Sequence, residues 1–597
     1  MKRVNLTVVG ALLIISNCCT AQSPTAKFES FPNVSPFPKS DPDKWQQLRQ
    51  DFTLSAADFD SRLSYNKYPV TNGSSNISVS GWKGERVNCL LVVSSKKDIN
   101  LVKTTVSDLK ADNGATIGAN SCNIGYVYYV VGDNSRGICH KKDIKYDDII
   151  VPDVIDFNGG SSFVKPFTNR PIWISFTIPQ SASPGSYKGK ITVSLDGRPF
   201  TSNILVKVLN RTMPPPVDRK FFLDLWQYPL TEAEYYKVKP WSDQHFNLMK
   251  RSMIQLKDAG QKVITTSFFW DMFNSTPRKA EDMMIKVIKK KDGQWDYDFD
   301  NFDRWVQFMM SLGIKDQITC YGLAPLNYRY HYFDEGTGQL AYFSQGVNGA
   351  DYRKFWTPYL QAFEKHLKEK GWFEITTLGI DEKELSVLTV LIDFIKSQDK
   401  DWKISVTGKY FPQIQDNVYH YAVISNQQVP DADLAGRKAK GYITTFYTSC
   451  WELFPNTFVM SDPIDATWLS WNAANRSLDG YSRWAYDYWS MGKNALVDVR
   501  STLSAGDNFI IYPSGYSSIR FEMLKDGIED YEKIYQKSGN SGAAPAGSVA
   551  RQVRTLAAPV GQSDQLKKSL SDFDFKKVSA NRSRGLQVRE ARAMLDN

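Results

Sequence analysis

The stretch Phe373-Glu-Ile-Thr-Thr-Leu-Gly-Ile-Asp-Glu382 decides the fold of the central part of the chain. Its β-branched residues favour a strand, and that strand ends on two adjacent carboxylates, Asp381 and Glu382. The residues that follow carry apolar side chains at helical spacing: Leu385, Leu388, Leu391, Ile392 and Ile395. A strand followed directly by a helix is the repeating unit of a parallel barrel, whose chemistry lies at the carboxyl ends of its strands. The pair Asp381 and Glu382 is therefore the leading candidate for the catalytic centre.

The same alternation of strand and helix continues on both sides of this stretch. Eight strands are predicted, at residues 221–226, 262–268, 317–323, 375–382, 403–408, 419–425, 442–448 and 481–488. The clearest helices are predicted at residues 242–258, 301–312, 351–369 and 385–397. Eight strands with intervening helices, in a region longer than the ~250 residues that such a fold needs, indicate a (β/α)8 TIM barrel. A last strand-like piece at 509–513 precedes a helix from Ser517 that is expected to close the barrel.

A different pattern precedes this region. From about residue 80 to 210 the sequence alternates in short strands separated by turn signals such as Asp196-Gly197, which is typical of an antiparallel β-sandwich. Pro214-Pro215-Pro216 cannot continue a central strand or a helix and so marks the boundary. The predicted organisation is an N-terminal β-sandwich region at 22–213, a catalytic barrel at 217–536 and a helical C-terminal extension at 537–597. A linker rich in Gly, Ala and Ser is expected at 537–548.

The first 21 residues have the character of a signal peptide. Met1-Lys2-Arg3 is followed by an apolar stretch at 6–15, which is too short to span a bilayer. We expect export to the periplasm or the cell surface, with cleavage after Ala21 or, as the alternative, a lipid anchor on Cys18 or Cys19. No later segment is a transmembrane candidate. Five cysteines remain after Ala21, so at least one thiol is free or pairs with another molecule: Cys89, Cys122, Cys139, Cys320 and Cys450.

Composition excludes several classes of function. The 73 basic and 64 acidic residues give a net charge of +9, but the two signs are interspersed, so no nucleic acid partner is expected. The five histidines lack metal-ligand spacing, and the glycine-rich phosphate-binding motifs and the G-x-S-x-G hydrolase motif do not occur. Neither a metal nor an organic cofactor is expected, which leaves carboxylate chemistry. The 16 Trp, 30 Tyr and 33 Phe residues suit sugar stacking, although most of these rings must be core.

An adjacent Asp and Glu is weak evidence by itself. Asp334-Glu335 is a second such pair, but it lies in a glycine-rich turn, whereas Asp381 and Glu382 end the fourth strand of the predicted barrel. The alternative for Asp381 and Glu382 is an acidic cap at the N-terminus of the next helix. Position at a strand end favours the catalytic interpretation.

Four motifs together resemble glycoside hydrolase family 123: Gly379-Ile-Asp-Glu382, Thr445-Phe-Tyr-Thr-Ser449, Leu478-Asp-Gly-Tyr-Ser-Arg-Trp-Ala-Tyr486 and Ser518-Ile-Arg-Phe-Glu-Met-Leu-Lys-Asp-Gly-Ile-Glu-Asp-Tyr531. That family consists of retaining N-acetyl-β-galactosaminidases built as a β-sandwich followed by a (β/α)8 barrel. The resemblance implies an exo-acting enzyme that removes terminal β-linked N-acetylgalactosamine from glycans. It also implies substrate-assisted catalysis, in which the acetamido oxygen of the sugar is the nucleophile. The alternatives are a hexosaminidase for another epimer and a non-catalytic glycan-binding protein.

The resemblance also implies roles for the carboxylates. Glu382 would protonate the leaving oxygen and then activate water, and Asp381 would hold the acetamide N–H and stabilise the oxazolinium ion. A general acid must be protonated near neutrality, so a raised pKa is expected for Glu382, and an ionised neighbour would raise it. Adjacent side chains of a regular strand point oppositely, so the two carboxylates can converge only if the chain leaves the strand there.

Other strand ends provide candidates for substrate binding. Tyr447 ends the seventh strand and would donate its hydroxyl to the acetamide oxygen, with a core tyrosine as the alternative. Two of Trp484, Tyr486 and Asp487 are expected to face the barrel interior or its mouth, where a tryptophan would stack on the sugar and Asp487 would accept from hydroxyl groups. The weaker candidates, at the ends of strands three and five, are Tyr321 and Lys409. In the last motif, helix ion pairs are expected for Arg520, Glu522, Asp526 and Asp530.

Overall fold

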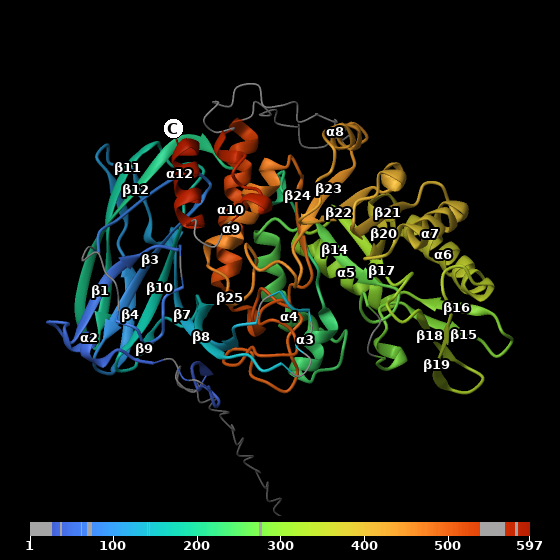
Figure 1. The fold of residues 1–597 in the computed structure, drawn as a ribbon, viewed down its shortest axis with the longest axis horizontal. Helices are drawn as coiled ribbons and strands as arrows, with labels where there is room; N and C mark the ends of the chain where they lie inside the picture. Colours follow the sequence, from blue (N-terminus) through green and yellow to red (C-terminus); the bar gives the residue numbers. More distant parts are fainter. Residues whose placement is uncertain are drawn as a thin grey trace, which may run out of the picture.

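The computed structural model describes residues 27–596, with gaps at 36, 38, 61, 69–74, 136, 140, 142–143, 274–276, 538–567 and 579–582. An N-terminal part made mostly of strands, blue to cyan in Figure 1, precedes a part that combines strands and helices, green to red. The expected signal peptide and nearly all of the expected 537–548 linker lie outside the described residues. In the described ranges, no helix is both long enough and apolar enough for a membrane span.

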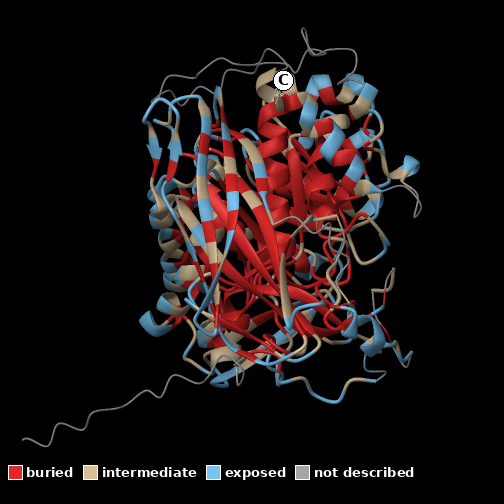
Figure 2. Cartoon of the chain, turned by 90° about the vertical axis from the view of Figure 1, so that its left-hand side faces the viewer, coloured by how far each residue is buried: buried red, intermediate tan, exposed pale blue. Residues whose placement is uncertain are grey.

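The N-terminal part consists of two sheets. The first has the strand order β1 (Phe52–Ala57), β3 (Arg86–Ser95), β10 (Thr168–Thr177), β7 (Cys122–Asp133) and β8 (Asp148–Asp156). The second has the order β2 (Ile77–Lys83), β12 (Arg198–Thr212), β11 (Gly185–Leu195), β4 (Ile99–Val106) and β9 (Ser162–Val164), with β5 (Leu109–Ala111) and β6 (Thr116–Ile117) attached. Strands near the viewer in Figure 2 alternate between exposed and buried residues, as expected for a sheet with one face in solvent.

The C-terminal part contains eight parallel strands in a nearly closed barrel. Their bounds are β13 (Phe222–Leu225), β14 (Val263–Ser267), β17 (Gln317–Tyr321), β20 (Thr376–Asp381), β21 (Lys403–Gly408), β22 (His420–Ile424), β23 (Ile443–Tyr447) and β24 (Gly480–Arg483). Neighbouring strands pair in sequence order, and β13 also pairs with β24. Strands β13 and β14 do not pair along their length. A single β-bridge, between Leu223 and Gln261, connects this part of the barrel. The pair Asp381 and Glu382 therefore stands at the end of the fourth strand, as predicted.

Helices connect most of these strands. They are α3 (Pro229–Tyr236), α4 (Asp243–Asp258), α5 (Asp300–Leu312), α6 (Ala350–Lys370), α7 (Leu385–Gln398), α8 (Asp431–Ala439), α9 (Ile464–Asn475) and α10 (Ile519–Lys537). Further along, the described residues include η7 (Phe575–Lys577) and α12 (Arg584–Asp596), while α2 (Pro42–Gln46) precedes the first sheet. A small sheet of β15 (Lys286–Lys289), β16 (Trp295–Asp298), β18 (Arg329–Asp334) and β19 (Gln339–Ser344) projects beside the barrel (Figure 1).

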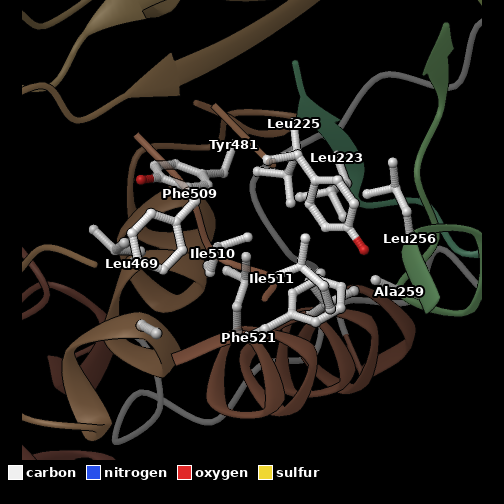
Figure 3. Close-up of a cluster of buried hydrophobic side chains, with 14 of the residues drawn as sticks. Leu223, Leu225, Leu256, Ala259, Leu469, Tyr481, Phe509, Ile510, Ile511 and Phe521 are labelled. Carbon is white, nitrogen blue, oxygen red and sulfur yellow. The ribbon is translucent and has the colours of Figure 1, made fainter. Parts of the chain in front are cut away.

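Helix α10 lies between the barrel and the first sheet, so every residue from Ile519 to Ile534 is buried. Figure 3 shows its Phe521 beside Ile511, in the same buried cluster as Leu223 and Leu225 of β13. The short strand β25 (Ser517–Ser518) precedes α10 and extends the first sheet beside β8. The two parts of the chain therefore share one continuous core.

Two sequence-based boundaries are wrong. The strand expected at 481–488 ends at Arg483, because the following backbone bonds elsewhere: Tyr486 N–H donates to Trp226 O at 2.8 Å. The strand-like piece at 509–513 forms no strand and only two isolated bridges, from Phe509 to Asp487 and from Tyr512 to Tyr516. By contrast, Asp334-Glu335 lies at the turn between β18 and β19, as its glycine-rich context predicts.

Candidate active site

A network of hydrogen bonds identifies the side chains that point into the barrel. Gln317 Nε2 bonds Thr319 Oγ1 at 2.9 Å and the ring of His420 at 3.2 Å. His420 in turn bonds Thr445 Oγ1 at 3.1 Å, and Thr445 bonds Ser482 Oγ at 2.8 Å. Because side chains of a barrel strand alternate between inside and outside, residues two positions further along face the interior one layer nearer the carboxyl ends. That layer contains the candidates Tyr321 and Tyr447, with Gly379 beside Tyr321, and Asp381 follows two positions further along β20.

The backbone turns sharply at Glu382. This residue has a φ of 42°, in the left-handed region that non-glycine residues seldom adopt. Its N–H donates to Thr407 O at 2.8 Å, and Gly408 lies so close that an added Cβ would be 3.5 Å from Glu382 Cα. The chain thus leaves the strand directly after Asp381, which is the condition predicted for the two carboxylates to converge. Non-glycine residues held in this conformation cluster at functional sites.

Tyr447 is hydrogen-bonded to one of the two carboxylates, Glu382. Its hydroxyl donates to Glu382 Oε1 at 2.7 Å, so the end of the seventh strand contacts the carboxylate at the end of the fourth. Burial, the charge of Glu382 and this bond together hold the pKa of Tyr447 well above its usual range. Tyr447 therefore stays a neutral hydrogen-bond donor across the physiological pH range.

Asp381 is the more deeply buried carboxyl group. Burial, and then the neighbouring charge of Glu382, raise its pKa to about 8, although Lys383 acts in the opposite direction. This raised pKa favours the protonated form of Asp381 near neutrality. The raised pKa expected for Glu382 stays a prediction, and the structure assigns a raised pKa to its neighbour.

A hollow opens beside Asp381, lined by Tyr321, Gly379, Lys383, Phe273, Leu326 and their neighbours. Gly379 is required here, because a methyl group at this position would lie 2.6 Å from the ring of Tyr321. The tyrosine ring instead reaches Trp226, with the ring centroids 4.6 Å apart. Phe273 and Tyr321 contribute two aromatic rings to the lining of this hollow, and such rings can stack on the apolar face of a sugar.

Trp484 belongs to the same aromatic cluster. Its ring contacts Phe273 at 5.6 Å, Tyr488 at 5.9 Å and Tyr228 at 6.3 Å between centroids. Trp226, Tyr228 and Tyr321 are the buried members of this cluster, and Trp484 is only partly buried. Trp484 is therefore partly accessible to solvent, unlike the buried rings of the cluster.

The structure does not bring three other candidates to the pair. Tyr486 is fully buried and donates to Ser252 O at 2.7 Å, on the outer side of the barrel. Asp487 is also fully buried, and its Oδ1 accepts from Tyr228 N–H at 2.8 Å, so it supports the aromatic cluster from beneath. Lys409 is exposed on the rim and pairs with Glu384 at 3.3 Å.

Sequence reasoning missed Trp226, Phe273 and Lys383. Trp226 directly follows the first barrel strand and Lys383 directly follows the carboxylates, so the strand-end criterion that selected Asp381 would also have found both. Phe273 lies in the connection after β14 and carries no comparable signal. Across the described residues, no group of three or more His, Cys, Asp or Glu side chains is arranged to hold a metal ion.

A mainly β domain followed by a barrel with two adjacent carboxylates and an aromatic wall at the carboxyl ends of its strands defines a carbohydrate-active barrel protein. The sequence comparisons agree with that class. Residues 226–536 match the model of the glycoside hydrolase 123 catalytic domain, and residues 57–195 match that of the glycoside hydrolase 123 N-terminal domain. The chain therefore belongs to glycoside hydrolase family 123 and is a glycosidase by family.

One solved structure supports the fold, and two others are similar only at a low score. A family 123 glycoside hydrolase from Clostridium perfringens, described in work on glycolipid glycan hydrolysis, is 24% identical with a TM-score of 0.78, covering 92% of this chain and 97% of its own. A GH10 xylanase from termite gut, 10% identical, has a TM-score of 0.31 and covers 76% of this chain and 99% of its own. The Parabacteroides merdae β-glucuronidase is 9% identical and has a TM-score of 0.29. The match covers 80% of this chain and 52% of the glucuronidase chain. The comparison with curated proteins gives no match.

Proposed function

We propose that the chain is an exo-acting glycosidase that releases terminal β-linked N-acetylgalactosamine by substrate-assisted, retaining catalysis. The observation that carries the proposal is the contact between strand ends four and seven, where Tyr447 donates to Glu382 beside the half-buried Asp381. This arrangement supplies one carboxyl group near solvent and one beside a hollow at the barrel mouth. The two environments suit two different roles.

Glu382 is the acid and base of this scheme. Its side chain is exposed at the barrel mouth, where a leaving group and then a water molecule have access. In the first step the acetamido oxygen bonds to the anomeric carbon, the glycosidic bond breaks, and the leaving oxygen takes the proton of Glu382. In the second step Glu382 takes a proton from water, which opens the oxazolinium ion and restores the original anomeric configuration.

Asp381 holds the acetamido group. Before substrate binds, Asp381 carries the proton of the pair, since its pKa is about 8. When substrate binds, its acetamide N–H donates to Asp381, and positive charge then develops on the oxazolinium ring. Both changes favour the ionised form of Asp381. The proton of the pair therefore moves to Glu382, from which it is transferred to the leaving oxygen. The buried position strengthens this charge stabilisation, because a low dielectric environment enhances it.

A comparison of aryl 2-acetamido glycosides tests the proposal. We expect hydrolysis of the β-galacto compound, with much slower hydrolysis of the β-gluco epimer. Preference for the gluco epimer would indicate another hexosaminidase, and binding without turnover of either would indicate a glycan-binding protein. Glycolipid glycans, the subject of the Clostridium perfringens work, are natural compounds to include.

We further propose that the protein is exported, either cleaved near Gln22 or anchored at Cys18 or Cys19. Support comes from the disulfide between Cys139 and Cys450, since such bonds persist in oxidising compartments. Mass analysis of the N-terminus of protein from its native host distinguishes these forms. An intact Met1 in a cytosolic fraction would contradict export.

A further inference from the structure

The connection from β23 to α9 contains a loop, residues 448–456, that is held by many side-chain bonds. The amide of Asn456 donates to Ser449 O at 2.9 Å and to Glu452 O at 2.8 Å. Glu452 Oε2 accepts from the N–H of Ser449 at 2.7 Å, and its other oxygen accepts from Ser425. The guanidinium of Arg483 donates to Thr448 O at 2.8 Å. The loop is therefore fixed from within and by its neighbouring strands.

The N-terminal part also holds this loop. A disulfide joins Cys450 to Cys139, which follows β7 of the first sheet. At Gly137 an added methyl group would lie 2.8 Å from Leu453 Cδ2, so the backbone of this sheet connection packs directly on the loop. The barrel's seventh strand end is thus braced from outside the barrel.

The side chains that this rigid loop leaves in solvent are apolar. Trp451 is 68% exposed and Leu453 is 51% exposed, whereas most tryptophans of the chain are buried. None of the ring contacts of the described residues involves Trp451. The exposed apolar area of these two residues is much smaller than the several hundred Å² of a surface that docks a protein or a membrane. A single indole ring, however, is about the size of the apolar face of one sugar ring.

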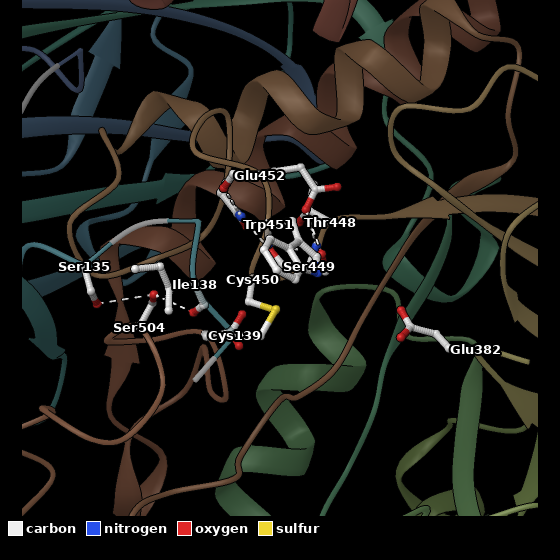
Figure 4. The surroundings of a disulfide bond; sticks show 12 residues. Ser135, Ile138, Cys139, Glu382, Thr448, Ser449, Cys450, Trp451, Glu452 and Ser504 are labelled. Carbon is white, nitrogen blue, oxygen red and sulfur yellow. Dashed lines mark hydrogen bonds between the residues drawn. A yellow bond between two sulfur atoms is a disulfide. The ribbon is translucent and has the colours of Figure 1, made fainter. Parts of the chain in front are cut away.

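The loop lies next to the proton donor. It begins directly after Tyr447, whose hydroxyl bonds Glu382. Figure 4 shows the carboxylate of Glu382 pointing toward the loop that carries Cys450 and Trp451. The leaving group of a glycosidase occupies the side from which its general acid protonates the glycosidic oxygen.

We propose that Trp451 is the platform of a leaving-group subsite, on which the sugar ring next to the cleaved bond stacks. This inference rests on the proposed function, because it assigns the leaving-group side by the role of Glu382. The proposed function places the terminal sugar at the separate hollow, whose lining includes Tyr321 and Asp381. The disulfide and the packing of Gly137 give the N-terminal part a role in positioning this platform.

The test measures two readouts that separate the subsites. One is kcat/KM for a disaccharide with a terminal β-N-acetylgalactosamine, and the other is inhibition by the monosaccharide thiazoline, which reaches only the terminal-sugar hollow. For Trp451→Ala we expect kcat/KM on the disaccharide to fall about fivefold to tenfold, the effect of one lost stacking contact, mainly through KM. The thiazoline inhibition constant should stay within twofold, and Trp451→Phe should restore most of the loss.

Unchanged disaccharide kinetics in Trp451→Ala would overturn the platform. An equal loss of thiazoline binding would also overturn it, since the residue would then support the loop and not the leaving group. If the wild-type enzyme cleaves no 2-acetamido glycoside, the proposed function itself fails and the platform fails with it. If it cleaves them and only the variant result is negative, the proposed function stands without the platform.

Discussion

At the scale of single residues, the site depends on two neighbouring carboxyl groups in unequal surroundings. Asp381 is enclosed and carries a raised pKa, while Glu382 is exposed and bound by Tyr447. The positive φ of Glu382 is what turns the second carboxylate toward Tyr447. Exchanging the two residue types would therefore change how far each carboxylate extends and which surroundings it occupies.

Glu382→Gln removes the proton donor. We expect turnover of natural glycans, whose leaving groups need protonation, to fall by ~10²–10⁴-fold. Activated aryl glycosides, whose leaving groups depart without a proton, should lose far less. Steady-state kinetics on both substrate types measure the difference, and equal losses would remove Glu382 from the role of acid.

Activity should also depend on the proton that the pair shares. Asp381 has a pKa of about 8, so as the pH rises through that value the pair loses its last proton and nothing can protonate the leaving group. The kcat/KM profile should therefore fall on the alkaline side near pH 8. In Asp381→Asn the overall rate should drop and this limb should move to lower pH, because Glu382 no longer has a like-charged neighbour. A wild-type profile that stays flat to pH 9.5 would contradict this account.

At the scale of elements, β20 positions the site through a close approach. Gly379 lies directly beside Tyr321 in the pairing of β20 with β17, and the tyrosine ring occupies the space above it. Seven of the eight barrel strands could be predicted from sequence because β-branched runs and helical spacing alternate regularly. The eighth strand was predicted too long. The backbone of residues 484–486 leaves the strand because it bonds to segments distant in sequence, and no local pattern reveals those bonds.

The same limit applies to the site residues. Asp381, Glu382 and Tyr447 were selected because each stands at a strand end, a position that sequence can locate. Tyr486 and Asp487 were chosen by extending strand alternation beyond Arg483, where the strand has already ended. The pairing of Cys139 with Cys450 joins residues 311 positions apart, and the spacing of five cysteines cannot identify it.

Gly379→Ala tests the close approach. The added methyl group would lie 2.6 Å from the ring of Tyr321, so the ring must shift and the hollow beside Asp381 must change shape. We expect the free energy of unfolding to fall by about 1–3 kcal/mol and kcat/KM to fall at least tenfold. Gly436→Ala in α8 is the matched control, because nothing lies within 4 Å of the added atom and activity should not change. Wild-type kinetics in Gly379→Ala would contradict the packing argument.

At the scale of the whole molecule, buried ion pairs join the two parts. Arg520 of α10 pairs with Asp153 of β8 at 2.9 Å, and Arg86 of β3 pairs with Glu522 at 2.6 Å and with Asp526 at 3.0 Å. The sequence predicted ion pairs for these α10 residues but placed them within the helix. Their partners lie mostly in other segments, including Arg592 of α12, which pairs with Asp530 at 2.7 Å.

Arg520→Met should destabilise the whole protein. It leaves Asp153 buried without its cation, which typically costs about 3–5 kcal/mol. The double variant Asp153→Asn with Arg520→Met should recover much of that loss, because no unpaired charge then remains. Denaturant unfolding of the wild type, both single variants and the double variant measures the coupling, and strictly additive losses would contradict a direct interaction.

The central claim is that the nucleophile belongs to the substrate, and one comparison tests it most directly. Two aryl β-galactosides that differ only at C2, one with an acetamido group and one with a hydroxyl group, are offered to the wild-type enzyme. We predict efficient hydrolysis of the first and essentially none of the second, because removing the acetamido group deletes the attacking atom. Efficient cleavage of the 2-hydroxyl compound, or a covalent sugar trapped on an enzyme carboxylate, would contradict the account.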